Sequence, residues 1–555
     1  MLILPEGLTL QGTSAAPRGR GIVATRVFQP GEVIATFSSP SIAIPDSPHL
    51  STTCSGCLLP SAPGSDPPSP SQPARVVRAC TGCRTVAYCS PACQKLDWTV
   101  GGHKAECKVF KRVRAEGHDF LPTPVRALVQ GLLRPEMMAE VQGHVGGFRR
   151  ASGKLWADTE LQAMAALHYL GRQTNARSLA EAIEVSCKLQ VNSFNRLDED
   201  VGQTGLFMNP HLAMVNHSCI PNAFVQFISR QAVLHAYREI NKDEEVEISY
   251  IDCTTHLSQR QEALKTRYQF TCECPRCKDD INVYQVCRRY PHLRLNRLSL
   301  APDVENLQDY QESSLGTNES LGATVEEIFP LFSNSLVGLN ESDKQKQLCQ
   351  GWTACKPFLD SRTPAHAVEP LPSVLLEATV YFGEQGNFTS ALSICCFLAT
   401  QVDPYKAAAP FAPQRIKGLL MIAKLLSNTA PADPHPSLSS IKTLTLGKSL
   451  WGGISKVLGK MDQATVCQVL LELVVYYAPA AHSKEWALFR AAKDLLDDIE
   501  ALQDREMEDA LVKAFLRNPN GAEERLFFEQ VVLGPIRELS AFCFDVMDNE
   551  FGSKP

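Results

Sequence analysis

Short runs of apolar and β-branched residues, broken by glycine and proline, open the chain. Residues 19–37 read GRGIVATRVFQPGEVIATF, a pattern that is typical of strands joined by turns. The pattern returns within 203–253, where AFVQFI, AVLHAY and EVEISYI either alternate apolar with polar residues or are apolar throughout. We therefore expect strands on both sides of a long intervening segment.

The intervening segment and the second half of the chain are helical in pattern. In LQAMAALHYL (161–170) the apolar residues recur at spacings of three and four, so we expect helices over about 108–190 and over most of 281–555. Residues 373–404 predict a helix pair joined at Gly386-Asn387, with small and aromatic residues where a tetratricopeptide-like repeat has them. An irregular helical domain is the alternative for this half. The predicted fold class is α+β.

The 20 cysteines among 555 residues narrow the choice of compartment. Seven lie within 54–107, a second group of four consists of Cys219, Cys272, Cys274 and Cys277, and the remaining nine are scattered. Clustered cysteines of an intracellular protein usually bind metal, and many scattered unpaired thiols are typical of a reducing compartment. We therefore expect the protein in the nucleus, the cytoplasm or both. A secreted, disulfide-bonded protein is a rival interpretation, which the sequons at Asn318, Asn340 and Asn387 nominally favour.

The composition excludes several other classes of protein. Hydrophobic residues make up 44% and charged residues 21%, which is ordinary for a folded chain and excludes collagen and wholly disordered proteins. No apolar run approaches the roughly 18 residues that a membrane-spanning helix needs, so no membrane partner is expected. The first residues, MLILPEGLTL, lack the basic region of a secretory signal. The net charge of −6 is too small to indicate a partner.

The cysteine spacing predicts three zinc sites. Two CxxC pairs, a C-x3-C pair and an H-x3-C pair supply eight ligands within 54–107, enough for two closed tetrahedral sites with no position left for water. We expect an interleaved assignment. One set is Cys54, Cys57, Cys89 and Cys93, the second is Cys80, Cys83, His103 and Cys107, and a third consists of Cys219, Cys272, Cys274 and Cys277. Between the first ligand pairs, Pro60 to Pro73 is too rich in proline to bury apolar surface, and we expect a dispensable loop.

The segment that carries these ligands is basic. Residues 75–114 contain nine Lys and Arg against Asp97 and Glu106, an excess of seven positive charges. Such a segment could bind an acidic peptide or a nucleic acid. A merely solvated basic face is the alternative.

Three further motifs occur in a fixed order. They are Arg18-Gly19-Arg20-Gly21, then Asn216-His217-Ser218-Cys219, and then the stretch EEVEISYID at 244–252. Each is weak alone. Together they resemble a SET-domain lysine methyltransferase, and AYCSPACQKLDW with HKAEC resembles a MYND zinc finger. The chain therefore resembles the SET-and-MYND family, with specific motifs over about 1–280.

The resemblance implies an arrangement of domains. A β-rich SET core would be split by the finger and a helical insertion, and a helical lobe would follow. The predicted boundaries are 1–53 for the first part of the SET domain, 54–107 for the finger, 108–190 for the insertion, 191–253 for the core SET domain, 254–280 for the post-SET segment and 281–555 for the helical domain.

The resemblance also implies site residues. The cofactor would be S-adenosylmethionine, with three structural zinc ions, and the substrate a lysine of a histone tail or another protein. Tyr250 would be catalytic, with Phe194 beside it in the lysine channel. The cofactor-binding residues would be Arg18, Gly19, Arg20, Asn216, His217, Tyr268 and Phe270. The sequence departs from the family pattern at Arg20, Ala213 and Asp243, where smaller polar residues, serine and glycine are common.

These features favour an enzyme, a protein-lysine N-methyltransferase. The alternative is a non-catalytic adaptor in which a degenerate SET fold presents the finger and the helical lobe to partner proteins. An intact Asn216-His217 pair and Tyr250 favour the enzyme, because an adaptor needs neither.

Overall fold

The chain folds into two units. Unit 1 consists of Met1–Ile251 and Arg260–Cys272, and unit 2 of Asp252–Gln259 and Glu273–Pro555. The structure is a computed structural model, and it describes residues 4–12, 19–61, 75–151, 153–198, 202–290, 325–328, 336, 339–359, 365–429, 448–478 and 486–552. Arg18 and most of the predicted loop from Pro60 to Pro73 lie outside the described residues.

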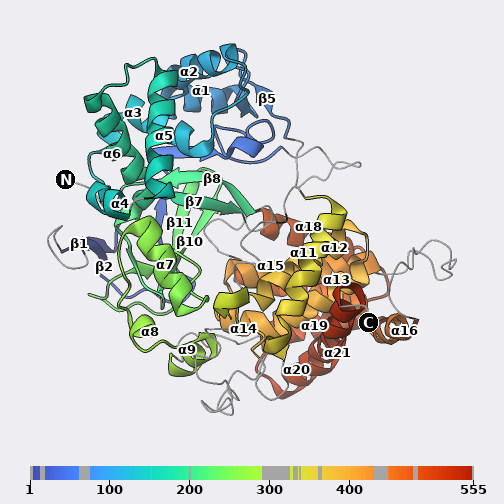
Figure 1. The fold of residues 1–555 in the computed structure, drawn as a ribbon. Helices are drawn as coiled ribbons and strands as arrows, with labels where there is room; N and C mark the ends of the chain where they lie inside the picture. The colour runs from blue at the N-terminus through green and yellow to red at the C-terminus, as the bar shows by residue number, and fades with distance from the viewer. Residues whose placement is uncertain are drawn as a thin grey trace. The chain divides into compact units, whose positions relative to one another are not determined.

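Small antiparallel sheets form the core of unit 1 (Figure 1). Strand β1 (Leu8–Gln11) pairs with β2 (Gly21–Ala24), and β3 (Val33–Phe37) pairs with the hairpin of β10 (Ala223–Ile228) and β11 (Gln231–Ala236). Strand β8 (Gly202–Met208) lies between β4 (Ile42–Pro45) and β7 (Phe194–Asp198). The strands predicted within 19–37 and 203–253 are confirmed. Their buried faces share one core, which includes Ile22, Phe28 and Leu234.

Two short strands form a separate parallel pair. Strand β9 is Asn216–His217 and pairs with β12, Glu247–Ile248, in the register Asn216↔Glu247. The predicted strand EVEISYI is therefore regular over only two of its residues, because β9 offers only two partners. Ahead of it, Asp243 has φ 67°, the left-handed conformation in which glycine is common and which Asp tolerates.

Helices fill the segment between the strands, as the periodicity predicts. They are α1 (Pro91–Thr99), α2 (His103–Ala115), α3 (Thr123–Leu133), α4 (Val145–Ala151), α5 (Lys154–Leu170) and α6 (Ala176–Asn192), with the two-stranded β5 (Arg78–Ala79) and β6 (Ala87–Tyr88) before them. Helices α3, α5 and α6 pack side by side. Their buried faces form a second core that also takes in the cysteines of the finger. Helix α7 (Leu257–Tyr268) follows strand β12.

Over its described residues, unit 2 consists of helices joined by turns and loops. Its helices include α8 (Pro275–Lys278), α9 (Val283–Arg289), α11 (Glu341–Ala354), α12 (Leu371–Glu384), α13 (Phe388–Phe397), α14 (Asp403–Lys406), α15 (Pro413–Thr429), α16 (Lys448–Leu458), α17 (Gln463–Tyr477), α18 (Ala487–Glu500), α19 (Glu506–Arg517), α20 (Ala522–Phe527), α21 (Gly534–Ser540) and α22 (Cys543–Phe551). The predicted helix pair is α12 and α13. Gly386 turns the chain at φ 70°, and the Asn387 side chain caps α13 by accepting from Ser390 N.

The helices and the cysteines bear on the membrane-protein and disulfide-bonded classes considered above. Over the part of the chain that is described, no helix combines the length and apolar character that crossing a bilayer requires. All 20 cysteines lie in the described residues and none of them forms a disulfide there, so the structure gives no support to the disulfide-bonded interpretation.

Candidate zinc centres and candidate active site

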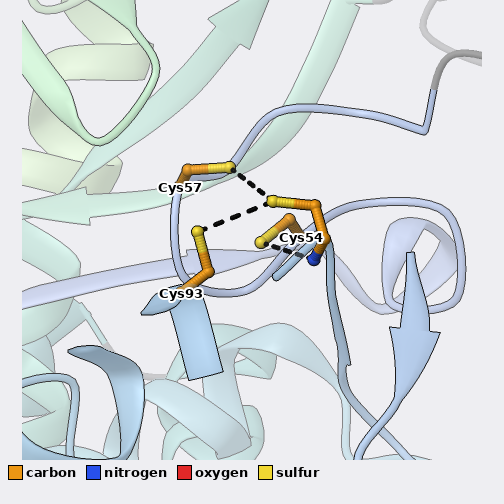
Figure 2. Close-up of side chains that lie close together, drawn as sticks. Cys54, Cys57 and Cys93 are labelled. Carbon is orange, nitrogen blue, oxygen red and sulfur yellow. Dashed lines mark hydrogen bonds between the residues drawn. The ribbon is translucent and has the colours of Figure 1, made fainter. Parts of the chain in front are cut away.

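The first zinc set is assembled as the spacing predicts. The candidate ligand atoms of Cys54, Cys57, Cys89 and Cys93 all lie within 4.8 Å of one another. Figure 2 shows three of these side chains converging, and the sulfur of Cys89 lies 3.8 Å from that of Cys57 and 3.6 Å from that of Cys93. Sulfurs bound at about 2.3 Å to a tetrahedral zinc are about 3.8 Å apart, so these donors fit that ion.

Local turns place these sulfurs. The Ser90 side chain caps α1 by accepting from Cys93 N, which fixes Cys93 in the first helical turn. A Cβ at Gly56 would lie 2.5 Å from Cys93 O, so only glycine lets the Cys54 to Cys57 turn approach α1 this closely. The turn is also held from the SET core, because Ser229 Oγ donates to Cys57 O over 2.8 Å.

The second set is Cys80, Cys83, His103 and Cys107, all buried and again within 4.8 Å. His103 begins α2 and Cys107 follows one turn later, so both point to the same side of the helix. The Nε2 atom of His103 lies 3.7 Å from Cys83 Sγ, and its Nδ1 atom lies 3.2 Å from Glu106 Oε2. Nε2 is thus the nitrogen that faces the ligand set, and the Glu106 carboxylate orients the ring from behind, as carboxylates commonly do beside zinc-binding histidines.

Sequence reasoning missed the buried ion pair behind His103. Arg126 on α3 donates to both carboxylate oxygens of Glu106, over 2.8 and 3.1 Å, and Gln130 Nε2 donates to Glu106 Oε1 over 3.0 Å. Glu106 is fully buried and Arg126 is 2% exposed. Burial opposes ionisation of Glu106, but the charge of Arg126 and the hydrogen bonds outweigh it, so the pKa of this carboxyl lies well below its usual range. The finger and the helical insertion therefore share one buried polar network.

The third set also gathers. The sulfurs of Cys219, Cys272, Cys274 and Cys277 lie within 4.8 Å of one another. Gln261 on α7 holds Cys272 by two hydrogen bonds, one to its carbonyl oxygen at 2.8 Å and one from its N–H at 2.9 Å. All three sets have the soft donors and the fourfold composition of structural zinc sites, so three zinc ions fit this chain.

Asn216 and His217 lie on β9, beside the cysteine of the third set. Tyr250 N donates to His217 Nδ1 over 3.1 Å, and His217 Nε2 lies 3.3 Å from Cys219 Sγ. Because Nδ1 accepts this hydrogen bond, the neutral ring carries its hydrogen on Nε2 and directs it at the sulfur. His217 thereby connects the Tyr250 backbone to a candidate zinc ligand.

Aromatic rings gather around Tyr250. Its ring centroid lies 4.7 Å from that of Tyr268, 5.2 Å from that of His217 and 6.5 Å from that of Phe270. The Tyr250 hydroxyl donates to Val215 O over 2.6 Å, and the Tyr268 hydroxyl donates to Tyr250 O over 3.3 Å. Burial raises the pKa of Tyr268, which keeps its hydroxyl protonated. Four of the predicted site residues are thus brought together: His217, Tyr250, Tyr268 and Phe270.

The glycine-rich segment lies against the same strand. Asn216 Nδ2 donates to Arg20 O over 3.2 Å, and Gly19 adopts φ 72°. The long Arg20 side chain is directed to Glu140 O, at 2.9 Å. Phe194, on β7, has its ring contact with Phe227, at 6.4 Å between centroids. Its place in a lysine channel stays a prediction.

Comparison with known proteins agrees with this geometry. The SET domain family model matches residues 19–251. The SET domain and MYND-type zinc finger protein 6 of Schizosaccharomyces pombe is 33% identical over 266 residues, 47% of this chain and 50% of that protein. The histone-lysine N-methyltransferase ASHR1 of Arabidopsis thaliana is 29% identical over 285 residues, 48% of this chain and 55% of that protein.

The likeness is confined to part of each protein. The chain spans about half the length of these two curated relatives. A solved SET domain of LSMT, bound to lysine and AdoHcy, aligns over 95% of this chain and 91% of that chain, at 12% identity and with a TM-score of 0.23. Over residues 19–251 the chain thus matches the SET domain model, and it is similar to proteins named for a SET domain and a MYND-type zinc finger.

Proposed function

We propose that this chain is an S-adenosylmethionine-dependent protein-lysine N-methyltransferase. The observation that carries the proposal is the Tyr250 hydroxyl, which is anchored on Val215 O inside a cluster of rings next to Asn216-His217. An adaptor would need neither this anchored hydroxyl nor the aromatic cluster around it. The relatives named as lysine methyltransferases support the same activity.

The cofactor would lie along β9 and the glycine-rich segment. S-adenosylmethionine supplies a methyl group on a cationic sulfur, which a neutral amine can attack. Gly19, Arg20, Asn216 and His217 offer backbone and amide groups, and Tyr268 and Phe270 offer aromatic surface, so the residues present suit a ligand with both polar and planar parts. We include Arg18 among them on sequence grounds alone.

Tyr250 would orient the substrate amine. Its hydroxyl donates to Val215 O, and a phenolic oxygen that donates can also accept an N–H from a lysine amine. An acceptor at this place aligns the nitrogen for in-line approach to a methyl group. Lysine normally holds its proton up to a pH near 10.4, and an apolar ring-lined site favours the neutral amine that reacts.

Cofactor binding is expected to depend on Asn216. Replacing Asn216 by alanine removes a side chain that links the glycine-rich segment to β9, and S-adenosylmethionine should bind about 5- to 150-fold more weakly. Titration calorimetry measures the change. As a matched control, Asn175→Ala removes the cap of α6 and should lower stability while leaving the affinity unchanged. Unchanged binding by Asn216→Ala would place the cofactor elsewhere.

The finger would recruit an acidic partner, either a peptide or a nucleic acid. Lys104, Lys108, Lys111 and Arg112 are exposed along α2, and Trp98 of α1 is 39% exposed. Exposed positive side chains on one helix suit an acidic partner, which would be distinct from the lysine-bearing substrate, a histone tail or another protein. A nuclear, cytoplasmic or dual location is compatible with this chemistry.

Reversing two of these charges should remove the interaction. Lys108→Glu with Lys111→Glu is expected to weaken binding to a polyglutamate peptide or to duplex DNA by at least about 10-fold at low salt, because surface attraction is lost. Binding measured at two salt concentrations checks this, and S-adenosylmethionine affinity should not change. Equal binding by the variant would favour a merely solvated basic face.

A further inference from the structure

Glu245 is fixed between two strands beside the glycine-rich segment. It forms an isolated bridge with Val23, and its neighbours are bonded to β2, with Ala24 N donating to Glu244 O over 2.9 Å and Val246 N donating to Ile22 O over 2.8 Å. The backbone of Glu245 is therefore held on both sides. Its side chain extends toward β9.

The Glu245 carboxylate receives the Asn216 amide. Asn216 Nδ2 donates to Glu245 Oε1 over 2.7 Å and to Arg20 O over 3.2 Å. A carboxylate and a backbone carbonyl are both acceptors, so the atom of Asn216 that faces them must be the nitrogen. The orientation of this amide is thus set by chemistry, and its Oδ1 atom points away from Glu245.

Gly21 leaves the room for this pair. A Cβ at Gly21 would lie 2.4 Å from Glu245 Oε1 and 2.9 Å from Asn216 Nδ2. No L side chain fits there without displacing the carboxylate or the amide. The Glu245–Asn216 hydrogen bond therefore explains why glycine stands at position 21.

We infer that Glu245 is a positioning residue for cofactor binding. It turns the Asn216 amide so that Oδ1 accepts a hydrogen bond from the cofactor, and this inference rests on the proposed function. Among the described residues, no hydrogen bond reaches Asn216 Oδ1, so this acceptor is available to a donor on a ligand. The role assigned to Glu245 is exerted through Asn216, whose amide it holds, and not on the reacting atoms themselves.

A double-mutant cycle tests the inference, with S-adenosylmethionine affinity as the measurement. Glu245→Ala should weaken binding by about 10-fold, because the amide loses its closer acceptor. Glu245→Gln keeps an oxygen acceptor and should stay within about 3-fold of the wild type. In the Asn216→Ala background, Glu245→Ala should add less than about 2-fold, because the residue through which it acts is gone. Glu244→Gln, the neighbouring acid that pairs with Arg238, is the matched control and should bind as the wild type does.

Each other outcome has a definite meaning. Additive losses in the cycle would show that Glu245 supports the strands and not the amide, and would overturn the inference. A Glu245→Gln loss as large as that of alanine would show that its charge attracts the cationic cofactor directly, which also overturns it. If Asn216→Ala weakens binding but Glu245→Ala does not, the inference fails and the proposed function stands. If the wild type binds no S-adenosylmethionine, both fail.

Discussion

Replacing Arg126 by methionine is expected to lower the free energy of unfolding of unit 1 by about 3–5 kcal/mol. The substitution keeps most of the side-chain volume but leaves the buried Glu106 without its cation, and an uncompensated buried charge is costly. Glu106 also orients His103, so the second zinc set should loosen. Urea unfolding measures the free energy, and elemental analysis should show a fall from about three zinc equivalents toward two.

A nearby arginine provides the control for this experiment. Arg134 is only partly buried and donates to Val100 O and Gln130 Oε1, so Arg134→Met should cost about 1 kcal/mol and leave the zinc content unchanged. The double variant Arg126→Met with Glu106→Gln removes both charges and should recover part of the loss. If Arg126→Met and Arg134→Met were equally stable, the buried ion pair would have no special role.

Spacing predicted the zinc sets because their geometry is local. CxxC turns and the His103 to Cys107 helical turn bring ligands together within a few residues, so the sequence was enough to assign both interleaved sets. The hydrogen-bond network behind His103 could not be predicted from the sequence, because Glu106 contacts Arg126 only when α2 packs against α3. The one local signal was an acidic residue at the third position after a histidine ligand, where it can reach the ring.

The candidate active site was predictable in a different way. Periodicity predicted the strands and helices, but nothing in the composition connects Tyr250 with Tyr268 and Phe270. These residues were named from the order of motifs, and their rings meet because α7 returns the chain to the end of β12. The partners of the polar groups, Val215 O for Tyr250 and Glu245 for Asn216, depend on long-range packing that no spacing reveals. Arg18 and the loop from Pro60 to Pro73 stay predictions.

Replacing Tyr250 by phenylalanine is expected to slow methyl transfer by about 100-fold or more while cofactor binding survives. The substitution removes one oxygen and keeps the ring, so the contacts with His217 and Tyr268 remain. What is lost is the acceptor that aligns the amine, and misplacing an attacking atom by about 1 Å costs on the order of 100-fold. The lost hydrogen bond to Val215 O should cost only about 1 kcal/mol of stability.

Single-turnover transfer at saturating labelled S-adenosylmethionine separates this effect from binding, with protein lysines of a cell extract as acceptors identified by mass spectrometry. Tyr169→Phe is the matched control, because the ring contacts of Tyr169 are with His118 and His168. Equal rates for the wild type and Tyr250→Phe would remove Tyr250 from the mechanism. If the wild type transferred no methyl group to any protein, the adaptor would be favoured. A steep loss of the transfer rate with unchanged cofactor affinity would show that the Tyr250 hydroxyl acts mostly in the transition state, where a positioning acceptor must act.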